Sequence, residues 1–145
     1  MRNEKLENVD VLVGEWTLTL SDAFFLEPPG TEVHGSATVE WFNDAFLLVR
    51  STLDGELSLA IGRSDANDAY WVLYHDDRGV CRLFAMTWDA GRWTMSREDP
   101  DFHQRFVADV EPDRISGRWE ASEDEGRTWR KDFDLVFERV LERPR

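Results

Sequence analysis

The sequence predicts an all-β protein, a ten-stranded antiparallel up-and-down barrel preceded by a short N-terminal helix. The chain contains ten short, evenly spaced stretches typical of strands, and in most of them apolar and polar residues alternate, as in strands that bury one face. Most of these stretches are joined by tight turns rich in Asp, Asn, Gly and Pro. Neighbour-to-neighbour hairpins without a long crossover favour a barrel over a sandwich. At 145 residues, the chain is expected to form one domain, residues 1–145.

A helix is expected at residues 3–13, before the first strand. Asn3 can cap its first turn, and Leu6, Val9 and Val13 fall near one face. A helix this short is marginal in isolation, so its apolar side should dock on another element. The end of the barrel is the surface that we expect it to cover.

The strands follow from alternation and from the turns between them. Trp16 and Leu18, for example, share one side of the first strand. Turns at 76–79 and 89–91 divide the stretch 69–98 into a three-stranded meander. The expected strands lie at 15–20, 33–42, 45–52, 57–63, three within 69–98, 102–110, 114–121 and 129–140.

The connection at 22–32 is an unusual loop. Its prolines exclude a regular strand, yet it contains the adjacent residues Phe24 and Phe25. Two neighbouring phenylalanines are too apolar for a solvated connection. The loop is therefore expected either to fold over the mouth of the barrel or to pack on a partner.

The composition argues against several classes of protein. Thirty acidic and 17 basic side chains give a net charge of −13, which repels phosphate backbones and anionic membranes. We therefore expect neither nucleic-acid nor membrane binding. The single cysteine, Cys81, excludes an intrachain disulfide framework. The first ten residues carry no apolar signal-like segment, and no apolar run approaches the roughly 20 residues of a membrane span, so a cytoplasmic location is expected.

Motifs for metal binding or nucleophilic catalysis are weak in this sequence. The three histidines, at 34, 75 and 103, lack the spacing of metal ligands. The stretch 65–68 begins like a calcium loop but lacks the glycine and glutamate that such a loop requires. There is no Gly-x-Ser-x-Gly elbow and no glycine-rich phosphate loop. We therefore expect no metal, no cofactor and no recognisable catalytic residue.

A ligand site in the lumen is the strongest functional candidate. In a barrel, alternate residues point inward, so polar residues in phase with the apolar face of their strand are of interest. Four such residues are His75, Arg82, Arg97 and Gln104. The proposed aromatic wall of the lumen comprises Trp41, Trp71, Trp88, Trp93 and Trp119. A polar floor with arginines would suit an amphipathic molecule with a carboxylate or another acidic end.

The direction in which each face points is left open by the pattern. The three charged or titratable candidates lie close to strand ends, where a side chain can reach solvent without any ligand. The opposite face carries Arg105 and Glu120 on neighbouring strands. If that face is outward, these residues form a stabilising cross-strand pair. If it is inward, they become the leading site candidates.

Two of the expected strands are apolar on both sides. They cover residues 45–49 and 70–74, and a barrel wall that meets solvent does not need this second apolar face. A symmetric homodimer through this wall is the hypothesis that accounts for the surplus.

Several short motifs together resemble a known family. They are Leu12-Val13-Gly14-Glu15-Trp16, Ile61-Gly62 with Asp65 and Tyr70, Phe102 with Arg105-Phe106, Ile115 to Glu120, Ser122 with Asp124, Gly126 and Trp129, and Glu138-Arg139. The chain resembles a bacterial domain-of-unknown-function family of small calycin-like barrels, related in shape to lipocalins and fatty-acid-binding proteins. The resemblance implies a ten-stranded barrel with a central cavity and implies no catalytic residues. Similar haem-containing nitrobindin barrels also begin with a Gly-x-Trp strand, but their further motifs are not found here.

These observations lead to one functional hypothesis and two alternatives. The first is a non-enzymatic binder of a small apolar or amphipathic molecule in the lumen. The second is a small isomerase or hydrolase that uses the cavity, with His75 or His103 as the acid or base. The third is a protein-interaction module that docks a partner through the loop at 22–32.

Overall fold

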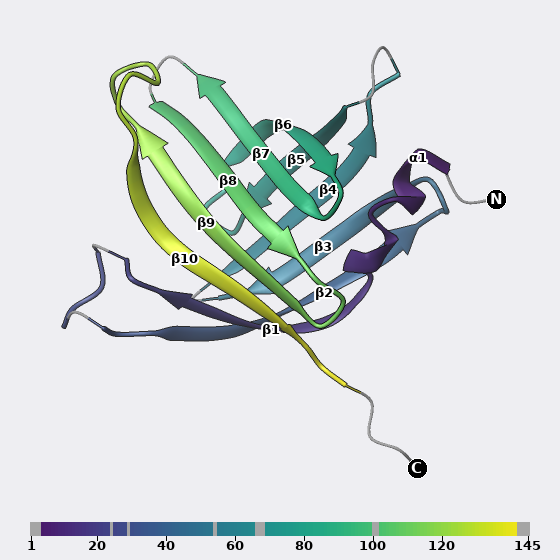
Figure 1. Ribbon diagram of the computed structural model, residues 1–145, viewed down its shortest axis with the longest axis horizontal. Helices are drawn as coiled ribbons and strands as arrows, with labels where there is room; N and C mark the ends of the chain where they lie inside the picture. Colours follow the sequence, from purple (N-terminus) through teal and green to yellow (C-terminus); the bar gives the residue numbers. More distant parts are fainter. Residues whose placement is uncertain are drawn as a thin grey trace.

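The structure is a closed antiparallel barrel of ten strands (Figure 1). The computed structural model describes residues 4–23, 25–28, 30–53, 55–65, 69–99 and 102–141, without the side chains of Asp99 and Phe102. Each strand pairs with its neighbours in sequence, and β1 closes the barrel by pairing with β10. The strands are β1 Gly14–Ser21, β2 Val33–Phe42, β3 Phe46–Thr52, β4 Glu56–Arg63, β5 Tyr70–Asp76, β6 Cys81–Asp89, β7 Arg92–Asp99, β8 Phe102–Val110, β9 Arg114–Ser122 and β10 Arg130–Arg139. The predicted fold class is confirmed.

The N-terminal segment is less regular than the single helix expected at 3–13. A short helix α1, Glu4–Glu7, is followed by a 3₁₀ turn, Asp10–Leu12. Leu6, Val9 and Leu12 are fully buried, and this spacing of three residues matches the period of a 3₁₀ helix rather than that of an α-helix. Docking of these side chains therefore decides the local conformation. The proposed cap, Asn3, lies outside the described residues.

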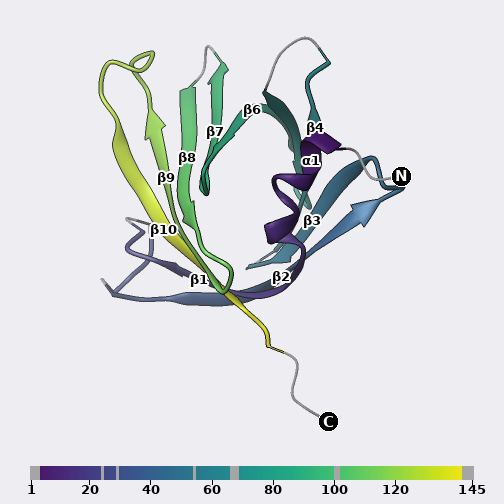
Figure 2. The ribbon, with the colours of Figure 1, turned by 45° about the vertical axis from the view of Figure 1, so that its right-hand side comes forward.

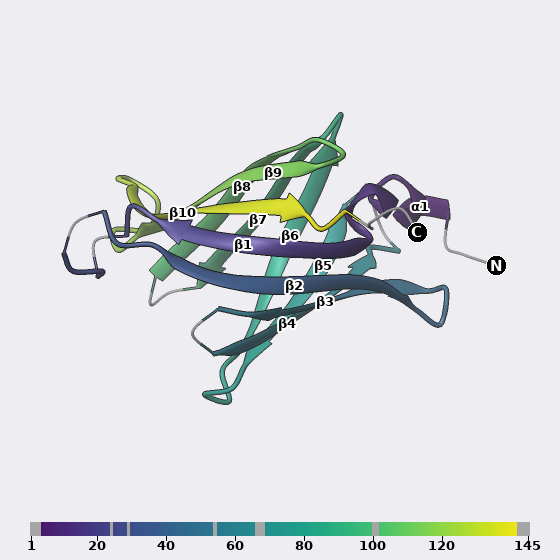
Figure 3. The same ribbon diagram turned by 90° about the horizontal axis from the view of Figure 1, so that it is seen from below.

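Three hydrogen bonds fix this segment across one end of the barrel. The Trp16 indole donates to the Leu12 carbonyl oxygen at 2.8 Å, and the Trp41 indole donates to the Asp10 carboxylate at 2.7 Å. The Tyr70 hydroxyl donates to a backbone carbonyl of α1 at 2.8 Å. Figures 2 and 3 show α1 at the same end of the barrel as the β2–β3 connection. The predicted lid is confirmed, and it closes one end of the lumen.

Arg139, at the end of β10, ties together the segments that meet at the barrel closure. Its guanidinium donates to the carbonyl oxygens of Val13 at 2.7 Å and Pro112 at 2.6 Å, and it stacks 4.1 Å from the Trp16 ring. A Cβ on Gly14 would lie 2.4 Å from this guanidinium, and the residue has φ +138°. The Gly-x-Trp start of β1 and the arginine of β10 are thus parts of one structural contact.

The outer wall carries the charge pair that the sequence left open. Arg105 on β8 donates to the Glu120 carboxylate on β9 at 2.9 Å, and it stacks 4.0 Å from the Trp129 ring. The neighbouring positions on these strands, Phe106 and Ala121, are buried on the other face. The pair is therefore an outward cross-strand contact rather than a lumenal one.

The helices among the described residues are too short to cross a membrane.

Replacing Arg139 by lysine should destabilise the barrel closure. A lysine ammonium can neither reach several carbonyl oxygens at fixed angles nor stack on the indole as a plane. We expect the free energy of unfolding to fall by about 2–4 kcal/mol, the scale of one or two lost charge-assisted hydrogen bonds. Urea denaturation measures the change. In the matched control, Arg114→Lys, an exposed arginine with a 3.9 Å contact to Glu138 is replaced, and the change should stay within about 0.5 kcal/mol.

A candidate ligand site in the barrel lumen

A cavity of about 270 Å³ occupies the part of the lumen away from the N-terminal helix. It is bounded at the barrel end by Leu53, Gly55 and Leu57, around the β3–β4 connection. Most of its lining is aliphatic or aromatic, because each strand places its apolar alternate residues inward. The polar side chains among its lining residues are Ser51, Tyr74, Arg82 and Gln104.

An aromatic wall forms one side of the cavity. Phe106, Trp119 and Phe133 are register partners on β8, β9 and β10, so their rings meet in one row across three strands. Ring centroids lie 5.1 Å apart for Phe106 and Trp119 and 6.5 Å apart for Trp119 and Phe133. Trp93 adds an edge-to-face contact with Phe106 at 5.0 Å. Such interlocked rings give a rigid apolar surface.

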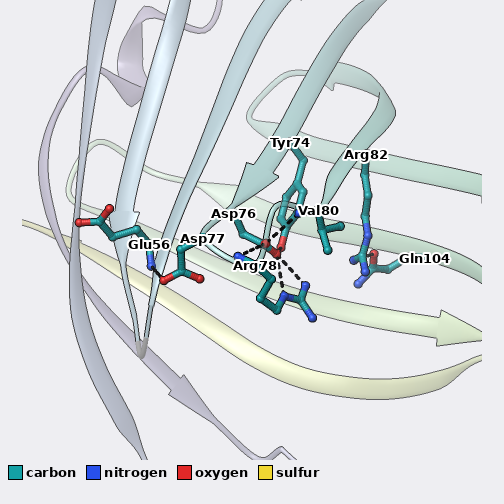
Figure 4. Close-up of polar contacts among 8 residues, drawn as sticks. All are labelled: Glu56, Tyr74, Asp76, Asp77, Arg78, Val80, Arg82 and Gln104. Carbon is teal, nitrogen blue, oxygen red and sulfur yellow. Dashed lines mark hydrogen bonds and ion pairs between the residues drawn. The ribbon is translucent and has the colours of Figure 1, made fainter.

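Arg82 and Gln104 form the polar part of the cavity. They come from β6 and β8, which are not adjacent strands, so their contact spans the intervening β7 (Figure 4). The Arg82 guanidinium donates to the Gln104 amide oxygen at 3.3 Å, and its centre lies 5.4 Å from the Tyr74 ring. Because the Gln104 side-chain oxygen accepts this bond, the second polar group of the same amide is its NH₂, which can only donate hydrogen bonds.

Tyr74 connects the cavity to the β5–β6 turn. Its hydroxyl donates to the Asp76 carboxylate at 2.8 Å, and Arg78 donates to the same carboxylate at 2.6 Å (Figure 4). The bond from Arg78 holds the pKa of Asp76 well below its usual range, and the bond from Tyr74 adds to this effect. Burial, and then the bond to Asp76, raise the pKa of Tyr74. At neutral pH the carboxyl is therefore ionised and the phenol is protonated.

The same turn is anchored to β4. The Asp77 carboxylate accepts a hydrogen bond from the Glu56 backbone N–H at 3.1 Å, while the Asp76 carboxylate also accepts one from the Arg78 backbone N–H at 3.0 Å (Figure 4). Aspartates commonly hold a turn by bonding nearby backbone N–H groups. The position of Tyr74 beside the cavity is thus fixed from both sides of the turn.

Four of the predicted site residues line the cavity. They are Arg82, Gln104, Trp93 and Trp119. Arg97 lies in register with Gln104 and on the same face of β7 as Trp93, but it is not among the residues that line the cavity.

The expectation that His75 and Trp71 face the lumen was wrong. Both are exposed on the outer face of β5, and Trp71 retains 46% of its surface. Since β5 is apolar on both faces, its sequence does not show which face is inward. The inward residues include Tyr70, Val72 and Tyr74, which the sequence pattern had left on the opposite face.

Trp41 and Trp88 were also misplaced by the sequence pattern. Trp41 is bound to Asp10 at the closed end of the barrel. Trp88 lies near the β6–β7 turn and packs against the core without reaching the cavity. Both face the inside of the barrel, but they lie nearer its closed end than the cavity does. Alternation predicts which face of a strand is inward and does not predict where along the barrel axis a residue lies.

Tyr74 is the main polar residue of the cavity lining that sequence reasoning missed. The alternation of Tyr70, Val72, Tyr74 and Asp76 was a usable signal, because a phenol beside an acidic residue in the same phase can satisfy its hydrogen bond when buried. Neither histidine of the enzymatic alternative lines the cavity. His103 is in register with Glu98 on β7 and Ser122 on β9, and the centroid of its ring lies 6.4 Å from that of the Trp129 ring. Among the described residues, no three His, Cys, Asp or Glu side chains gather into a metal site.

Comparison with known proteins supports the fold and leaves the family open. No protein-family model matches the chain, and no curated protein matches it significantly. Among solved structures, the chain is similar to Rv2717c from Mycobacterium tuberculosis, with a TM-score of 0.71 and 8% sequence identity. The match covers 97% of this chain and 100% of that protein. At this identity, the likeness shows a shared barrel fold and nothing about the ligand.

Acid should selectively remove the contribution of the Asp76 contacts to stability. Because the folded-state pKa of Asp76 is lowered, this stability is fully present above the ordinary carboxyl pKa of about 4 and is lost as the pH falls further. We expect Asp76→Asn to be less stable than the unmodified protein at pH 7. The difference should shrink steadily as the pH falls from 4 toward 2.

Chemical denaturation at a series of pH values measures this difference. Asp44→Asn, at an exposed position in the β2–β3 turn, is the control for the general effect of replacing a turn aspartate by asparagine. A penalty for Asp76→Asn that stays constant from pH 7 to pH 2 would contradict the assigned role of the ionised carboxylate.

Proposed function

We propose that this protein binds a small amphipathic molecule in the lumen of the barrel, without transforming it. The observation that carries the proposal is the cavity itself, with an aromatic and aliphatic wall and with Arg82 and Gln104 at one place in its lining. Apolar pockets with a few convergent polar groups are the usual form of small-molecule sites. The apolar body of the ligand would pack against the row of Phe106, Trp119 and Phe133.

The size of the cavity limits the ligand. Its volume of about 270 Å³ lies just below the usual range of ligand pockets, which is roughly 300–1,000 Å³. A compact molecule of one or two rings, or a short alkyl chain, fits this space better than a long acyl chain. Phe25, in the connection between β1 and β2, packs on the cavity-lining Phe133 with ring centroids 6.0 Å apart, while Phe24 lies outside the described residues.

The polar end of the ligand should be a hydrogen-bond acceptor. Arg82 carries donors only, the Gln104 amide presents its NH₂, and the Tyr74 hydroxyl already donates its hydrogen bond to Asp76. A guanidinium has five N–H donors and can serve more than one acceptor. A carboxylate or a similar acidic group matches this arrangement, because it accepts bidentate, charge-assisted hydrogen bonds.

We favour binding over the enzymatic alternative because the cavity lining offers no side chain that acts readily as a base near neutral pH. The titratable side chains of the lining are Tyr74 and Arg82. Burial raises the pKa of Tyr74, so the phenol is a poor base near neutral pH. We also propose membership of the calycin-like barrels that the sequence resembles, and a cytoplasmic location, as working hypotheses for choosing ligands and hosts.

A carboxylate series tests this proposal directly. We expect short alkyl and aryl carboxylates to bind more tightly than the corresponding primary amides, and Arg82→Met to abolish this preference. The loss of a charge-assisted hydrogen bond predicts about a 10- to 100-fold weaker affinity for the acid and little change for the amide. Isothermal calorimetry on ligand-stripped protein measures both.

Two further variants make the experiment specific for the lumen. Arg92→Met removes an exposed outer-wall arginine that pairs with Asp109 at 3.0 Å, and it should leave affinity unchanged. Leu57→Trp should reduce the free volume and weaken binding of both acid and amide. Equal effects of the Arg82 and Arg92 variants, or carboxylate binding that survives Leu57→Trp, would place the ligand elsewhere and refute the proposal.

A further inference from the structure

The outer wall of the barrel is divided into two chemically different halves. In Figure 2, β8, β9 and β10 form one side and β3 and β4 the opposite side. The outward residues on β7–β10 are mostly charged; they include Arg92, Arg105, Asp109, Arg118, Glu120 and Glu138. The outward positions in the middle of β3–β6 carry one charged residue, Arg50 on β3, which lies 3.9 Å from Glu40 on β2.

Strand register gathers the uncharged positions into one surface. Leu48, Ala60, Leu73 and Leu83 are successive partners from β3 to β6, and Gly62, Trp71 and Ala85 are successive partners in the next row. We call these seven residues the apolar face. Its largest side chains are well exposed, with 46% of Trp71, 44% of Leu73 and 56% of Leu83 accessible. The apolar face therefore contains no charged residue, although 32% of the residues in the chain are charged.

The apolar face combines a ridge with a shallow strip beside it. Trp71 and Leu73 project from β5, while the adjacent positions on β4 are Gly62 and Ala60. A Cβ built on Gly62 would meet no atom within 4 Å, so the space above this residue is open. A ridge next to a strip of small residues is self-complementary under a twofold rotation, because each copy can place its ridge over the strip of the other.

We propose that the apolar face is the contact of a symmetric homodimer, in which the Trp71–Leu73 ridge of each copy packs over Ala60 and Gly62 of its partner. The barrel is closed and offers no strand edge, so association must occur through side chains. The face also lacks the acidic groups that give the chain its charge of −13, so two copies meet there with little repulsion. This inference is independent of the ligand in the lumen.

The dimensions of the face predict a weak dimer. Four strands spaced by about 4.8 Å and about seven residues long give an outer wall of roughly 19 by 23 Å, of which the two rows of the apolar face are a part. With the side chains at its margin, each copy would bury on the order of 500 Å², which places the interface at the lower end of specific complexes. The dissociation constant should therefore be on the order of micromolar.

Sedimentation velocity of the full chain between about 1 and 200 µM tests this prediction. The unmodified protein should shift from monomer to dimer over this range. Leu73→Glu should leave only monomer at 200 µM, at least a 100-fold weakening, because it would bury a carboxylate on each side of the interface. The matched control is Val107→Glu, on the outer face of β8 beside Arg118, which should dimerise like the unmodified protein.

A second variant separates loss of the interface from loss of the fold. Gly62→Val fills the open space on β4, and its thermal unfolding temperature should equal or exceed that of the unmodified protein, because valine favours strands. The same variant should remain monomeric at 200 µM. A monomer at every concentration of the unmodified protein, or a dimer that persists in both the Leu73 and Gly62 variants, would overturn the proposal.

Discussion

The contact between Arg139 and Trp16 is the constraint on which the closed barrel depends. An up-and-down barrel has one seam where the first strand meets the last, and here that seam joins β1 to β10. A guanidinium at the end of β10 bonds carbonyl oxygens before β1 and before β9, and it covers the indole that in turn binds the N-terminal segment. Closure of the barrel and capping of its end are therefore coupled through a single side chain.

Closure also explains how a short chain sustains two different surfaces. With no free edge, each strand forms its backbone hydrogen bonds with two neighbouring strands, and the side chains decide what each wall contacts. On β5 this freedom is used fully. Tyr74 faces the cavity, while Trp71 and Leu73 face outward, so one strand contributes both to the lumen and to the apolar face.

Local signals in the sequence were sufficient for the fold. Aspartate- and glycine-rich turns, with clear alternation in most strands, placed all ten strands. The bounds of β2 Val33–Phe42 and β8 Phe102–Val110 agree with their expected spans residue for residue. The inward face was also predicted correctly where a strand is amphipathic. Arg82 and Gln104 were found in this way, because the opposite positions on their strands are polar or exposed.

The remainder of the site could not be read from alternation. On β5 both faces are apolar, so the phase was ambiguous, and the prediction of His75 failed together with the omission of Tyr74. On β10 a register shift between Lys131 and Phe133 interrupts the alternation that sequence reading assumes. The height of a residue along the barrel depends on the stagger of all ten strands, which explains why Trp41 and Trp88 were assigned to a cavity that they do not reach.

The docked N-terminal segment has a kinetic consequence for any guest of the lumen. Leu6, Val9 and Leu12 seal one end with side chains that are at most 1% exposed, so the lumen is a blind passage rather than a tunnel. A molecule held there must enter and leave through the same opening, and its apolar end must go in first if its polar group is to stop at Arg82. Whatever extends beyond that polar group would remain outside the protein, within reach of other molecules.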